Sequence, residues 1–152
     1  MKIHCRWVLL LTTFIVSIHL LNAQVNWDHS TFNKIVETAA DQNKLVMIDF
    51  YTDWCVPCKE VEKIIFTDDT AIVRFVNVTY VSTKINAEKG EGIALAKKYD
   101  VGGYPTLLFL DKNKNVVGRV LGTRARDRYF EAIKTAGKSE AQMNNRRVKR
   151  EK

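Results

Sequence analysis

Cysteine, histidine and proline are scarce in this sequence, which contains three, three and two of them among 152 residues. The few cysteines exclude a small scaffold that depends on a framework of structural disulfide bonds. No linker rich in proline or serine divides the chain, and no segment of the sequence is repeated. Because the length suffices for one domain with a full hydrophobic core, we expect a single folded domain.

The first 23 residues have the pattern of a secretory signal peptide. Lys2 and Arg6 precede a mostly apolar run over residues 7–21, and Ala23 supplies a small residue at a plausible cleavage point. The run is short and contains several polar residues, whereas a membrane-spanning helix needs about 20 apolar residues. We therefore expect cleavage after Ala23 and export of the protein. An uncleaved segment would instead tether the protein to a membrane.

Basic residues gather at the C-terminal end of the sequence, whereas residues 24–137 are nearly neutral. The net charge of +7 therefore describes the ends of the chain rather than its body. A basic segment without interleaved aromatic residues does not indicate nucleic-acid binding, so we expect no nucleic-acid partner. We expect residues 138–152 to form a disordered tail; weak attraction to anionic surfaces is the alternative. The basic residues of this segment are Lys138, Arg146, Arg147, Lys149, Arg150 and Lys152.

The spacing of apolar residues predicts strands separated by helices, followed by a hairpin and a closing helix. Crossover helices force neighbouring strands to be parallel, and a short turn forces them to be antiparallel. The expected fold class is therefore α/β, with a mixed central β-sheet flanked by helices on both faces. We expect Val61, Ile64 and Ile65 to face inward. The expected elements are an edge strand at 25–27, helices at 31–42, 56–66, 71–76, 90–99 and 125–136, and strands at 45–51, 78–85, 106–110 and 116–121.

Cys55 and Cys58 are the only cysteines that remain if Cys5 leaves with the signal peptide. They follow the apolar strand at 45–51, where a helix begins. The sulfur of Cys55 would face unpaired amide groups and the positive end of the helix dipole, which stabilise a thiolate. We expect Cys55 to be the attacking nucleophile and Cys58, less exposed and one turn later, to be the resolving thiol. This redox-active disulfide needs no other cofactor.

The shortage of histidine narrows the chemistry further. Only His29 remains outside the signal segment, far upstream of the cysteines, which excludes a Cys-His protease and a four-ligand zinc site in a single chain. Asp49 is the carboxylate on the strand that leads to Cys55. Burial there should raise its pKa and let it accept, through water, the proton that Cys58 loses. The alternative is a structural Asp49 that hydrogen-bonds to local backbone.

The residues around the cysteines resemble those of thioredoxins. The run Asp-Phe-Tyr-Thr-Asp-Trp-Cys-Val-Pro-Cys-Lys, residues 49–59, has the active-site pattern of that family, including an acid six residues before the first cysteine. Lys84 matches the lysine that pairs with this acid, and Gly122 matches a glycine near the end of the last strand. The resemblance covers about residues 25–136 and implies a thioredoxin fold for residues 24–137, with Lys84 as the partner of Asp49.

The same resemblance implies where a substrate would bind. Tyr104-Pro105-Thr106 matches the cis-proline loop of the family, which would lie opposite Cys55 and leave the backbone of Tyr104 free to pair with an extended substrate. Trp54 and Tyr51 either help to form the surface beside Cys55 or are core aromatic residues. The expected substrate-binding residues are Trp54, Val56, Pro57, Tyr104 and Pro105.

Within the family, the sequence is similar to an exported branch, the C-terminal thioredoxin-like domain of DsbD-type thiol:disulfide interchange proteins. Residues 25–27, 59–63 and 66–68 carry this similarity. The resemblance implies protein disulfides as substrates, a monomer in the bacterial periplasm, and a separate electron donor such as a membrane thiol:disulfide interchange protein. Pro57 favours reduction, because strongly oxidising relatives usually carry histidine there. The alternatives are an oxidase or isomerase on the same fold, and a non-enzymatic binding module with a permanent disulfide.

Overall fold

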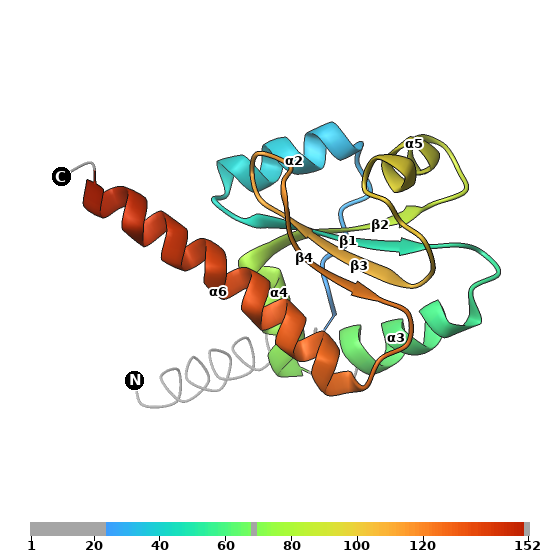
Figure 1. The fold of residues 1–152 in the computed structure, drawn as a ribbon. Helices are drawn as coiled ribbons and strands as arrows, with labels where there is room; N and C mark the ends of the chain where they lie inside the picture. The colour runs from blue at the N-terminus through green and yellow to red at the C-terminus, as the bar shows by residue number, and fades with distance from the viewer. Residues whose placement is uncertain (1–23, 68–69, 151–152) are drawn as a thin grey trace, which may run out of the picture.

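The computed structural model describes residues 24–67 and 70–150. Within these ranges the chain forms a four-stranded sheet with helices on both faces (Figure 1). The expected signal peptide, residues 1–23, lies outside the described residues. The elements are α2 (Phe32–Asp41), β1 (Leu45–Tyr51), α3 (Val56–Phe66), α4 (Thr70–Thr79), β2 (Tyr80–Asn86), α5 (Glu91–Lys98), β3 (Thr106–Leu110), β4 (Val116–Leu121) and α6 (Arg126–Arg150).

The sheet is mixed, as the sequence predicted. Its strand order is β2-β1-β3-β4. β1 pairs in parallel with β2, to which helices α3 and α4 connect it, and antiparallel with β3. β3 and β4 form the expected antiparallel hairpin. The predicted edge strand at 25–27 is reduced to a single parallel bridge between Trp27 and Ser82.

Two hydrophobic layers cover β1, one on each face of the sheet. Successive side chains of a strand point to opposite faces. Met47 therefore packs against α3, α4 and α6, whereas Val46 and Ile48 pack against α2 and α5. Figure 1 shows the same division, with α2 and α5 above the sheet and α3, α4 and α6 below it. Asp49 shares the face of Met47, so its carboxyl group points into the layer that contains α3.

Helix α3 buries a narrower face than the sequence pattern suggested. Cys58, Val61 and Ile65 are buried, at helical spacing of three and four residues. The expectation that Ile64 faces inward is wrong, because its side chain is 46% exposed while that of Ile65 is 1% exposed. The hydrophobicity of Ile64 could not reveal its direction, since neighbouring helical residues point about 100° apart.

Two helix ends differ from the predicted ones. Residues 78 and 79 belong to α4, so β2 begins at Tyr80 rather than at Val78. The final helix α6 continues to Arg150, although we expected it to end near Ala136 and to be followed by a disordered tail. Residues 138–150 contain no proline, and most of them are lysine, arginine, glutamate, alanine, glutamine or methionine, which favour helices. Gly137 alone does not end the helix.

The contrast between two adjacent isoleucines in α3 provides a test of the layered core. Ile65→Ala should lower the free energy of unfolding by about 2–5 kcal/mol, because it leaves a cavity in a buried layer. Ile64→Ala is the matched control and should cost less than about 1 kcal/mol. Urea denaturation of both variants measures the difference. Equal losses would contradict the described orientation of α3.

Candidate active site

Cys55 and Cys58 form a disulfide bond at the start of α3. Cys55 is the N-cap residue of the helix, and its Sγ accepts a hydrogen bond from the backbone N–H of Cys58 at 3.2 Å. Pro57 lies in the first turn, where a missing N–H costs no helical hydrogen bond. The positive end of α3 therefore meets the sulfur of Cys55, as the sequence predicted.

Exposure does not distinguish the two cysteines in the disulfide form. Cys55 is 2% exposed and Cys58 is 7% exposed, so the expectation that Cys58 is the less exposed residue is wrong for this state. The hydrogen bond from the Cys58 N–H is what sets Cys55 apart. Such a bond stabilises a thiolate on Cys55 once the disulfide is reduced.

Trp54 and Val56 present large apolar side chains beside the disulfide. They are 67% and 63% exposed, so the alternative in which Trp54 is a core residue is wrong. The indole N–H of Trp54 donates to both carboxylate oxygens of Glu88, at 3.0 and 3.2 Å. The ring packs edge-on against Tyr104, with 6.0 Å between the centroids. These two contacts fix an exposed aromatic surface next to Cys55.

Backbone hydrogen bonds connect the proline loop to the end of β4. The Tyr104–Pro105 peptide is cis, as the resemblance implied. The carbonyl of Pro105 accepts from the N–H of Gly122 at 2.8 Å. Gly122 has a φ of 70°, in the left-handed region that favours glycine, and its own carbonyl accepts from the Tyr129 hydroxyl at 2.8 Å. The chain Tyr129–Gly122–Pro105 therefore joins α6 to the loop.

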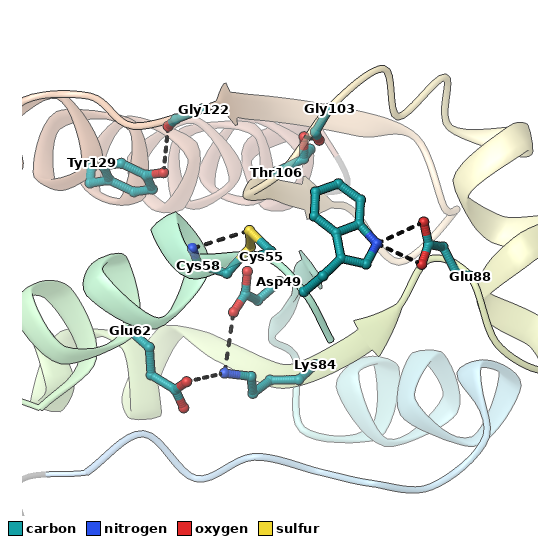
Figure 2. The surroundings of a disulfide bond; sticks show 11 residues. Asp49, Cys55, Cys58, Glu62, Lys84, Glu88, Gly103, Thr106, Gly122 and Tyr129 are labelled. Atoms are coloured by element: carbon teal, nitrogen blue, oxygen red, sulfur yellow. Dashed lines mark hydrogen bonds and ion pairs between the residues drawn. A yellow bond between two sulfur atoms is a disulfide. The ribbon is translucent and has the colours of Figure 1, made fainter. Parts of the chain in front are cut away.

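A buried carboxylate lies behind the disulfide (Figure 2). Asp49 is 3% exposed, and the parallel register of β1 and β2 places it directly beside Lys84. The Lys84 Nζ lies 3.5 Å from Asp49 Oδ2 and 2.7 Å from Glu62 Oε2. The lysine is therefore shared between a buried acid and a half-exposed one.

The surroundings of Asp49 change its acidity. Burial raises the pKa of Asp49 to about 6; the nearby charge of Lys84 opposes this rise, and that of Glu62 adds to it. A carboxyl group with this pKa can take up and release a proton near neutral pH. The raised pKa agrees with the sequence-based expectation, and the lysine neighbour agrees with the resemblance.

Three residues of the site were missed in the sequence. Glu62 follows Cys58 by four residues and so lies on the same face of α3, a spacing that could have revealed it. Glu88 and Tyr129 offer no such local signal, because they reach the site only through the tertiary fold.

His29 is exposed. In the part of the chain that the structure describes, no cluster of His, Cys, Asp and Glu could hold a metal ion.

The fold and the site define a thioredoxin-fold protein with a Cys-x-x-Cys disulfide at a strand-to-helix turn. The thioredoxin family model matches residues 23–135. The chain belongs to the thioredoxin family.

Solved structures of similar proteins agree with this assignment. A candidate disulphide-isomerase from Bacteroides thetaiotaomicron is 35% identical with a TM-score of 0.64, and the match covers 74% of this chain and 89% of that one. A thioredoxin from Thermus thermophilus is 24% identical with a TM-score of 0.63, covering 73% and 85% of the two chains. The second likeness shows the fold alone.

The curated relatives include much longer proteins named thiol:disulfide interchange protein DsbD. That of Yersinia pestis (strain Pestoides F) is 42% identical over 86 residues, which are 55% of this chain and 14% of the relative. That of Haemophilus influenzae (strain PittEE) is 34% identical over 98 residues, which are 63% of this chain and 17% of the relative. Across residues 24–67 and 70–150, no helix has the length and apolar character needed to cross a membrane.

Burial of Asp49 leads to a pH-dependent stability that can be measured. The pKa of Asp49 is about 6 in the folded protein against an ordinary value of 3.8, so the folded state binds this proton more tightly than the unfolded state. The contribution of this bound proton to the free energy of unfolding is complete below about pH 4 and is lost as the pH rises through about 6. Asp49→Asn removes the loss and should therefore stabilise the oxidised protein by about 3 kcal/mol at pH 8, with no gain at pH 3.5.

Urea denaturation across this pH range measures the effect. Asp53→Asn is the matched control, because the hydrogen bond and charge of Lys89 lower the pKa of the exposed Asp53. Asp53→Asn should instead destabilise the protein at pH 8, because the ionised Asp53 stabilises the wild type and this stabilisation is lost as the pH falls. A difference between Asp49→Asn and the wild type that does not change with pH would contradict the assignment.

Proposed function

We propose that this chain is an exported thiol:disulfide oxidoreductase that reduces protein disulfides at Cys55 and Cys58. The observation that supports it most is the arrangement around the cysteines. Cys55 caps α3 and accepts the Cys58 N–H, while the buried Asp49 lies beside Lys84 behind them. A permanent structural bridge would need neither an acid with a raised pKa nor an exposed aromatic surface.

In the proposed reaction two electrons pass from the dithiol to the substrate. The Cys55 thiolate attacks one sulfur of a substrate disulfide, a mixed disulfide forms, and the other substrate sulfur leaves as a thiolate. Cys58 then gives its proton to Asp49, directly or through water, and attacks the sulfur of Cys55. The mixed disulfide breaks, the second substrate thiolate leaves, and the Cys55–Cys58 disulfide forms.

The proposed roles of the remaining site residues follow from their positions. Lys84 lies beside Asp49 and would stabilise its carboxylate before the proton arrives. The substrate would lie on the exposed surface next to the disulfide and pair with the backbone of the proline loop. The residues assigned to substrate binding are Trp54, Val56, Pro57, Tyr104 and Pro105.

The cycle requires a donor that reduces the Cys55–Cys58 disulfide again. The relatives named thiol:disulfide interchange protein DsbD support a separate membrane protein of that class as the donor, and the periplasm as the compartment. We propose that the chain acts as a monomer, because Cys55, Cys58, Asp49 and Lys84 all come from one chain. No cofactor beyond the cysteines enters the proposed reaction.

A second candidate function runs the exchange in the other direction. An oxidase or isomerase on the same site is favoured by the Bacteroides thetaiotaomicron relative, whose description is a candidate disulphide-isomerase. Pro57 favours the reductase, because it places no cation between the cysteines, whereas a cation there would further stabilise the Cys55 thiolate and make the disulfide more oxidising.

Trapping a mixed disulfide tests whether the chain is an enzyme at all. Cys58→Ser removes the resolving thiol, so Cys55 should remain linked to its substrates, and non-reducing electrophoresis with mass spectrometry would identify them. Cys55→Ser is the matched control and should trap nothing. If Cys58→Ser forms no mixed disulfides in the periplasm, the proposal fails and the wild-type cysteines are a permanent bridge.

The reduction potential decides the direction. Equilibration of the purified chain with glutathione buffers should give a value near that of thioredoxin, about −270 mV. A value near −120 mV, typical of a strong oxidant, would overturn the reductase and favour the oxidase. Glu62→Gln and Asp49→Asn, measured alongside, would show how much each of the two acids beside Lys84 contributes to the potential.

A further inference from the structure

A surface groove runs between β4 and the first turns of α6, and none of its lining residues is one of the candidate-site residues described above. It has a volume of ≈810 Å³. We call it the β4–α6 groove. On the helix side, its residues recur every three or four positions, so they form one face of α6 over several turns. It is lined by Arg119, Val120, Leu121, Thr123, Arg124, Ala125, Arg128, Glu131, Ala132 and Thr135.

The other wall of the groove is the edge of a sheet. Three consecutive residues of β4, Arg119 to Leu121, line it. The side chains of consecutive strand residues point to opposite faces of the sheet, so a groove that contacts all three residues lies along the edge of the strand. β4 is the last strand in the described sheet and pairs only with β3. Its outer edge therefore offers backbone N–H and C=O groups to an added strand.

The groove carries an excess of positive charge. Arg119, Arg124 and Arg128 line it against the single acid Glu131, and all four residues are exposed. Arg119 is anchored by the carbonyls of Tyr99 and Asp100, and the Nε of Arg124 donates to the Leu121 carbonyl at 3.1 Å. Within the described residues Arg128 has no ion pair. These cations match a ligand with several carboxylates.

One end of the groove adjoins the proline loop of the active site. Leu121 lies against Gly103, where an added Cβ would be 3.4 Å from its Cδ1. The next residue, Gly122, donates its N–H to the Pro105 carbonyl. Figure 1 shows β4 ending beside the start of α6, on the side of the sheet where α3 begins. A polypeptide bound at Pro105 could therefore continue along β4.

We propose that the β4–α6 groove binds an extended acidic segment of the protein whose disulfide is exchanged at Cys55, as an added strand beside β4. The inference rests on the proposed function for the identity of the partner. Backbone pairing with β4 provides the extended conformation, and the arginines select carboxylates. The groove thereby gives the active site a preference among protein disulfides that the cysteines themselves do not have.

Binding of a cysteine-free peptide tests the groove without any redox step. The probe is a fluorescent ten-residue peptide with glutamate at alternate positions, and anisotropy measures its affinity for the purified oxidised chain. Arg124→Gln with Arg128→Gln should weaken binding by about tenfold, because two exposed ion pairs are lost. The matched control, Arg74→Gln with Lys97→Gln, removes the same charge outside the groove and should change the affinity less than about twofold.

Four outcomes would overturn the proposal. The first is an equal loss of affinity in the groove variant and the control, which would mean that only net charge matters. The second is equal binding of a peptide with lysine in place of glutamate. The third is equal binding of a peptide that is N-methylated at alternate residues, because such a peptide cannot form the ladder with β4. Inorganic phosphate that binds as well as the peptide would reveal an anion site only.

A second assay connects the groove to the active site. Two peptides with an internal disulfide, one with acidic and one with neutral flanking residues, are reduced by the dithiol form of the chain. The wild type and the Arg74→Gln/Lys97→Gln control should prefer the acidic peptide by about tenfold in kcat/KM, and the groove variant should lose this preference. If neither peptide is reduced by the wild type, the proposed function fails, whereas the binding assay still reports on the groove.

Discussion

The site depends on one buried carboxyl group in the central strand. β1 is covered on both faces, and Asp49 is the charged residue within it. A carboxylate in such a place is strongly disfavoured unless a cation lies beside it. The parallel pairing of β1 with β2 brings Lys84 into register with Asp49, and α3 brings Glu62 to the same lysine. When Asp49 is protonated, Lys84 keeps Glu62 as its partner, so neither protonation state leaves an isolated charge.

Much of the fold could be predicted because its signals are local. The apolar run of β1, the short turn between β3 and β4 and the helical spacing in α2 each depend on neighbours in the sequence. Together they imply the mixed sheet that the structure has. The cysteines and Asp49 of the candidate site could be proposed for the same reason, since they lie within one short segment around the end of β1. Lys84 and Pro105 needed the family resemblance, because Lys84 lies in β2 and Pro105 lies in the loop before β3.

The features that could not be predicted depend on contacts between distant segments. Ile64 and Ile65 have the same side chain, and only the placement of α3 against the sheet decides which one is buried. Glu88 and Tyr129 reach the site from the segment after β2 and from α6. The length of α6 was underestimated because the apolar pattern ends near Ala136. Most residues beyond it still have high helix propensity, and the helix continues to Arg150.

Gly122 connects the proline loop to α6 as well as following the end of β4. Its N–H donates to the Pro105 carbonyl and its C=O accepts from the Tyr129 hydroxyl, so the proline loop and the helix hold the two peptide groups on either side of one residue. A rotation or shift of α6 therefore changes the position of the proline loop, whose Tyr104 packs against Trp54. A force on the long C-terminal part of α6 would therefore be transmitted through Tyr129 and Gly122 to the proline loop of the candidate site.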